Sequence, residues 1–87
     1  MKPINPRQQG DYFLQLANKV LDKYKSEVTF SGRSRFLTGA HHVRSKIEGG
    51  CKGESLFTIV EELCMDRRMA PVEYLLLKTV DIFLSED

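Results

Sequence analysis

Apolar side chains recur through most of the chain at the three- and four-residue spacing of one helix face. The N-terminal segment shows this spacing at six positions: Phe13, Leu16, Ala17, Val20, Leu21 and Tyr24. The repeat predicts an amphipathic helix over about 6–26. Asn5 before Pro6 suits its start, because asparagine accepts hydrogen bonds from free backbone amides and proline fits the first helical position.

A second repeat is narrower and lies in a basic segment. Its apolar positions are Phe36, Ala40, Val43 and Ile47, which predict a helix over about 33–48. The stretch 28–32 is β-branched and turn-like, so we expect a connection there, with Ser31 or Ser34 as the cap. Gly49 and Gly50 end the helix, since glycine adopts the left-handed turn at little cost.

A third helix is predicted over about 55–68 and a fourth over 71–85. Ser55 is placed to cap the third, and Arg67 and Arg68 suit the negative end of its dipole. Pro71 separates the two helices, because the residue before a proline avoids the helical region. The apolar face of the third helix comprises Leu56, Phe57, Ile59, Val60, Leu63 and Cys64.

The fourth segment is apolar over an unusually wide arc. At 100° per residue its apolar side chains span about 220°, whereas a surface helix needs only about 100°. This helix is therefore either central in the bundle or shared with a second copy of the chain. We take the second interpretation as the prediction, with a self-association seam at Leu75, Leu76, Val80 and Phe83.

Together the segments predict an all-α fold, a compact four-helix bundle that forms one domain over 1–87 and dimerises. No apolar run approaches the roughly 20 residues of a membrane span, so no membrane partner is expected. Residues 1–6 lack the apolar stretch of a signal peptide, which predicts a cytoplasmic protein. In that reducing compartment Cys51 and Cys64 are expected to be free thiols.

Charge is sorted along the chain. Residues 1–52 contain ten Lys and Arg against four Asp and Glu, a net charge of +6, whereas residues 53–87 contain three against eight, a net charge of −5. The total of +1 conceals this division. Such a division favours a basic surface for an anionic partner and an acidic, apolar half for packing or self-association.

The basic helix supplies the candidate binding residues. Helical spacing places Arg35, His42 and Lys46 on one flank, and Arg33 and Arg44 near the other edge. Arginine and lysine here, with serine and threonine between them, can reach phosphate oxygens. Nucleic acid and an acidic protein surface are the two partners considered. The competing interpretation is an ordinary charged face in contact with water.

The sequence contains no arrangement of residues typical of a catalytic site or a metal site. Adjacent His41 and His42 point about 100° apart on a helix, so they do not chelate one ion. The glycine-rich link at 49–55 has neither the glycine spacing nor the preceding strand of a phosphate-binding loop. We therefore expect no enzyme activity, metal, cofactor or small-molecule substrate.

The sequence thus predicts a small non-enzymatic regulatory protein whose basic second helix contacts nucleic acid. The alternative is a protein-binding inhibitor, immunity factor or adaptor that docks on an acidic or apolar surface. In size and helix plan the chain resembles several classes of small bacterial or phage proteins, among them bacteriocin immunity proteins and transcription modulators. That resemblance lies in architecture alone and implies no residue roles.

Overall fold

The computed structural model describes residues 3–64 and 70–86. Within these ranges the chain is helical and contains no strand, which confirms the predicted all-α class. A 3₁₀ turn over Lys25–Glu27 joins the first two helices. The α-helices are α1 (Pro6–Lys23), α2 (Phe30–Glu48), α3 (Ser55–Leu63) and α4 (Ala70–Ser85).

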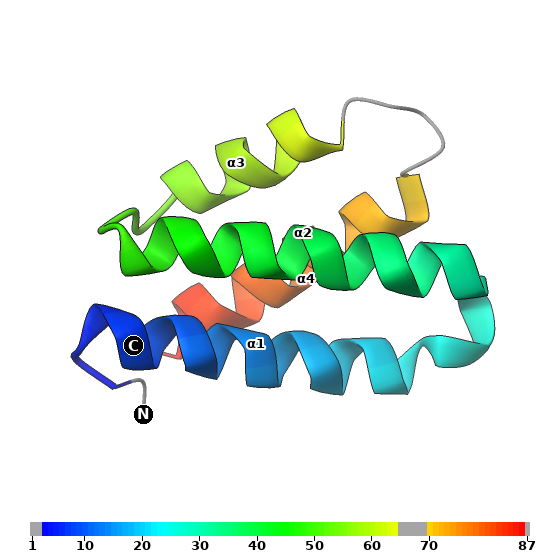
Figure 1. The fold of residues 1–87 in the computed structure, drawn as a ribbon, viewed down its shortest axis with the longest axis horizontal. Coiled ribbons are helices and arrows are strands. Elements are labelled where there is room, and N and C mark those ends of the chain that lie inside the picture. Colours follow the sequence, from blue (N-terminus) through cyan, green and yellow to red (C-terminus); the bar gives the residue numbers. More distant parts are fainter. Residues whose placement is uncertain (1–2, 65–69, 87) are drawn as a thin grey trace.

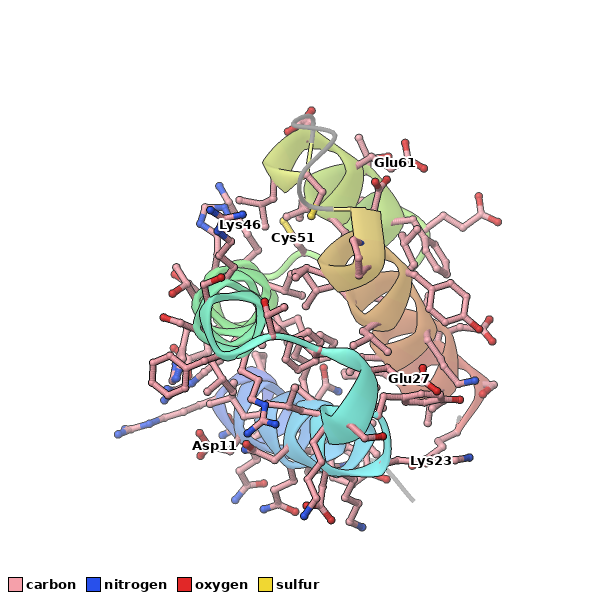
Figure 2. The ribbon with its side chains drawn as sticks, turned by 90° about the vertical axis from the view of Figure 1, so that its right-hand side faces the viewer. Asp11, Lys23, Glu27, Lys46, Cys51 and Glu61 are labelled. Atoms are coloured by element: carbon pink, nitrogen blue, oxygen red, sulfur yellow. The ribbon has the colours of Figure 1, made fainter. Side chains whose placement is uncertain are left out.

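The helices pack as a four-helix bundle measuring 34 × 24 × 18 Å. In Figure 1, α1 and α2 lie side by side and antiparallel, α4 crosses behind them, and α3 follows the opposite edge of α2. The end-on view of Figure 2 places α2 at one corner of the bundle, with α3 above it, α1 below it and α4 on the far side. α2 touches all three other helices. No helix in the described ranges is long and apolar enough to cross a membrane.

The starts of α1 and α2 follow from side-chain caps. Asn5 accepts a hydrogen bond from the Arg7 backbone N–H at 2.9 Å, as predicted. The predicted start of the second helix was wrong by three residues. Thr29 Oγ1 accepts from the Gly32 N–H at 3.0 Å, so α2 begins within the stretch expected to be a connection. The β-branched residues Val28 and Thr29 precede the first helical residue and are extended, so their weak helix preference does not oppose this start.

The start of α3 also differs from the prediction. Ser55 is the first helical residue, and its hydroxyl donates to the Lys52 carbonyl at 2.6 Å instead of capping the helix. Glu54 occupies the cap position without a side-chain hydrogen bond. Helix α3 extends to Leu63; the predicted continuation over 65–68, including both arginines, lies outside the described residues.

The proposed self-association seam is inside the core of a single chain. Leu75 and Phe83 are each 3% exposed, and Leu76 and Val80 are 0% exposed. The three other helices all pack against α4, which explains why its apolar arc is so wide. The prediction of a seam at these four residues is therefore wrong, and the alternative of a central helix is correct.

Two glycines allow helices to approach closely, with different neighbours. A Cβ added at Gly39 would lie 2.8 Å from Cδ1 of Leu76, which is fully buried. One added at Gly10 would lie 3.0 Å from the Cγ atoms of Arg44 and Glu48. The neighbour of Gly39 is held by the core, whereas the neighbours of Gly10 are flexible side chains at the surface.

We expect Gly39→Ala to destabilise the protein and Gly10→Ala to be neutral or stabilising. Crowding a packed core costs about 1–3 kcal/mol, which at Gly39 outweighs the roughly 1 kcal/mol that alanine gains in a helix. At Gly10 the side chains of Arg44 and Glu48 can shift, so the stability that alanine gains in a helix is retained. Urea denaturation measures both free energies of unfolding, and equal values for the two variants would contradict this packing.

Candidate nucleic-acid interface

α2 is a helix almost without acidic side chains. No Asp or Glu occurs from residue 30 to residue 47, and Glu48 is its last residue. The same span carries four arginines and lysines and two histidines. Eleven of its 19 residues are exposed. Positive charge is thus concentrated on a helix that is largely open to solvent.

The outward face of α2 carries hydroxyl and imidazole groups. Its members each precede a core residue by two positions, which turns them about 200° away from the core. All four are exposed. In Figure 2 the side chains of α2 project outward from its corner of the bundle. This outward stripe consists of Ser34, Thr38, His41 and Ser45.

Three of the predicted contacts lie on the side of α2 that faces α3. Arg35 and His42 line a pocket of about 270 Å³ whose apolar walls include Leu76. His42 and Lys46 line a second pocket of about 260 Å³ between α2 and α3. Both pockets share His42 and Leu63, so they adjoin along one side of the helix.

The other two predicted contacts lie toward α1 and are engaged there. Arg33 Nη2 donates to the Lys25 carbonyl at 3.0 Å. Arg44 Nε donates to Glu48 Oε1 at 3.0 Å, and its Nη2 lies 3.3 Å from Asp11 Oδ1. Two carboxylates therefore balance the charge of Arg44. The five residues form two separate edges of α2, and Arg44 is the one least able to meet an anion.

The edge facing α3 has a cation open to a partner. No hydrogen bond or ion pair within residues 3–64 and 70–86 engages the ammonium group of Lys46, and the residue is exposed. Glu62, also exposed, lines the same pocket as Lys46, and this carboxylate reduces the local positive potential. The positive potential at this end of the edge is therefore lower than the charge of Lys46 alone would give.

The two cysteines are free thiols in the structure, as predicted. Cys64 is buried, and burial raises the pKa of its thiol, with the nearby charge of Glu73 adding to the effect. A thiol held protonated is a poor nucleophile. In the described part of the chain, no three His, Cys, Asp or Glu side chains gather closely enough to hold a metal ion.

One pair of polar side chains near the end of α1 could not be predicted from the sequence. Lys78 Nζ donates to Tyr24 Oη at 2.9 Å and lies 5.1 Å from the centre of that ring. This hydrogen bond lowers the pKa of Tyr24 and raises that of Lys78. The two residues are 54 positions apart, and no local pattern could have joined them. The pair ties α1 to α4, away from the outward stripe of α2.

We expect Lys78→Met to shift the ionisation of Tyr24 to higher pH. The lysine stabilises the ionised phenol, so removing it should return the pKa of Tyr24 toward its usual value. An alkaline titration followed by tyrosinate absorbance measures this. Because Lys78 also lies 5.9 Å from the centre of the Tyr74 ring, the curve of Tyr24→Phe is needed beside that of Lys78→Met to assign the change to Tyr24. Superimposable curves would show that the contact has no electrostatic effect in solution.

No protein-family model matches the chain, and neither a curated protein nor a solved structure shows significant similarity to it. The features of the chain that bear on function are therefore its own residues and their arrangement, chiefly the outward stripe of α2 and the basic residues at the two edges of this helix.

Proposed function

We propose that the protein is a small non-enzymatic regulatory protein that binds nucleic acid through the outer face of α2. The observation that carries this proposal is the absence of any carboxylate from residue 30 to residue 47, on a helix with eleven exposed positions. Arginine and lysine bind phosphate oxygens, and hydroxyl and imidazole groups add hydrogen bonds. Such a surface suits a polyanion.

The uneven distribution of charge along the chain supports the same proposal, because it would orient the protein as it approaches a polyanion. Residues 1–52 carry a net charge of +6 and residues 53–87 a net charge of −5. The first part forms α1 and α2, and the second forms α3 and α4. A polyanion is attracted to the α1–α2 side and repelled by the other, which favours encounters that present α2.

Binding of nucleic acid should be direct and sensitive to salt. Fluorescence anisotropy with labelled duplex DNA, single-stranded DNA and RNA is expected to detect binding at about 50 mM salt and weaker binding at about 200 mM, because neutralised phosphates release counterions. If none of the three ligands binds at the lower salt concentration, the proposal is wrong.

A second candidate function is supported by the pockets between α2 and α3. Their apolar side chains include Ile59, Leu63 and Leu76, beside basic residues on α2. An inhibitor, immunity factor or adaptor could dock another protein here, with the basic residues accelerating encounter more than they strengthen binding. A partner protein that binds the original chain but not Ile59→Asp, while nucleic acid does not bind, would favour this function.

The proposed regulator acts as a homodimer in the cytoplasm, where nucleic acid is accessible. Two copies would present two α2 helices to one ligand. The seam must use apolar side chains of α4 that its own core leaves uncovered, since the four predicted residues are buried. Tyr74, 60% exposed, is the largest of these. Sedimentation equilibrium should give twice the 10.0 kDa chain mass; a single-chain mass would remove this part of the proposal.

A further inference from the structure

We infer that the nucleic acid bound by α2 is double-stranded DNA, and that the helix lies in its major groove. This inference rests on the proposed function and assigns the ligand of the same surface. It follows from the position of α2 in the bundle, from the groups on its outward face and from the cations at its two edges.

The position of α2 allows a duplex to approach it. With 19 residues it is about 28 Å long. Viewed end-on, it forms an outer corner of the bundle, between α3 above and α1 below (Figure 2). The major groove of B-form DNA is about 12 Å wide and accepts a helix of about 10–12 Å diameter. The helix at this corner therefore has the diameter that the groove accepts.

The outward stripe can contact base edges. From Ser34 to Ser45 it extends about 16 Å along the helix axis. Thr38 Oγ1 donates its hydrogen to the Ser34 carbonyl at 2.9 Å, so its oxygen acts as an acceptor and its methyl group remains available to a thymine. Serine and threonine hydroxyls bond to the edges of either base pair, and imidazole offers both a donor and an acceptor.

Cations lie at both edges of this stripe. Arg35 and Lys46 follow the edge toward α3, and Arg33 lies at the edge toward α1. The backbones that bound the major groove pass on both sides of a docked helix, so cations at both edges meet phosphates of different strands. Arg44 is excluded from this set because Asp11 and Glu48 already balance its charge.

The same surface suits single strands and RNA less well. Single-strand binding relies on aromatic rings on which successive bases stack. Among the described residues, Phe30 and Tyr74 are the large aromatic side chains counted as exposed, and they belong to different helices, α2 and α4. The major groove of an RNA duplex is deep and too narrow for side chains to reach its bases. The one exposed aromatic ring that the described part of α2 carries, Phe30, can stack a single base but not successive ones.

The test compares three ligands of one sequence: a DNA duplex of about 16 base pairs, roughly 54 Å long, its single strands, and the corresponding RNA duplex. We expect the DNA duplex to bind at least about tenfold more tightly than the others at about 50 mM salt. With Arg33, Arg35 and Lys46 on phosphates, each bound α2 contributes about −2.7 to the salt slope, so binding through one helix weakens about 40-fold between 50 and 200 mM.

Matched lysine variants locate the contact. Lys46→Ala should weaken duplex binding and reduce the magnitude of the salt slope by about 0.9 for each bound α2. Lys23→Ala should change neither, since Lys23 lies on the opposite side of the bundle in Figure 2. Single strands or RNA that bind as tightly as the duplex would overturn this inference and leave the proposed function standing. Duplex binding that is unchanged in Lys46→Ala would overturn the assignment to α2. If none of the three ligands binds, both this inference and the proposed function are wrong.

Discussion

Leu76→Ala is expected to lower the free energy of unfolding by about 2–5 kcal/mol, because it removes buried methyl groups and leaves a cavity. Leu76 has no exposed surface and packs against Gly39, where α4 meets α2. Its neighbour Leu77 is only partly buried, so Leu77→Ala should cost less and provides the matched control. Thermal and urea denaturation measure both variants.

The consequence of Leu76→Ala depends on the small size of the domain. Eighty-seven residues typically yield a stability of about 4–13 kcal/mol, so this single change removes a large share of it. We expect a lower melting temperature and, at the upper end of the range, loss of the folded state. A variant as stable as the original protein would show that the core has been assigned to the wrong residues.

Adding acidic residues to the outward face of α2 should abolish nucleic-acid binding without unfolding the protein. Ser34→Asp combined with Ser45→Asp places two carboxylates on the stripe that faces the base edges, between the two phosphate backbones that bound the groove. Like charges in contact cost several kcal/mol, so affinity should fall about 100-fold or more. Both serines are exposed, and the fold should lose no more than about 1 kcal/mol through the helix dipole at Ser45.

The matched control for this double variant adds the same charge to another helix. Gln8 and Gln15 are both exposed on α1, and Gln8→Glu with Gln15→Glu changes the net charge by the same two units. We expect this control to retain most of its affinity at moderate salt, where distant charges are screened. Equal losses in the two double variants would mean that net charge, and not the face of α2, controls binding.

Local signals were sufficient to predict the helices. The apolar repeats identified all four, and Asn5 with Pro6 identified the start of α1. The start of α2 differs from the prediction because Thr29 caps the helix in place of Ser31 or Ser34. The β-branched residues around Thr29 are typical of a connection and conceal this start. The wide apolar arc of α4 was recognised, but two explanations fitted it. Only the packing of the three other helices distinguishes a central helix from one shared with a second copy.

The parts of the candidate site that the sequence could not predict are the contacts between residues far apart in the chain. The two edges of α2 follow from 100° per residue, and the sequence was enough to propose them. The pairing of Arg44 with Asp11 joins residues 33 positions apart, and that of Lys78 with Tyr24 joins residues 54 apart. Such pairs depend on how α1 packs against its neighbours. No helical periodicity encodes them.

Chemical-shift mapping on ¹⁵N-labelled protein locates the surface of the protein that binds the duplex, residue by residue. Titration with the DNA duplex at low salt should perturb the backbone amides of α2, most strongly between Ser34 and Lys46, and leave the exposed side of α4 around Tyr74 unchanged. Perturbation centred on α4, or an unchanged spectrum at saturating duplex, would contradict the assignment of α2 as the binding surface.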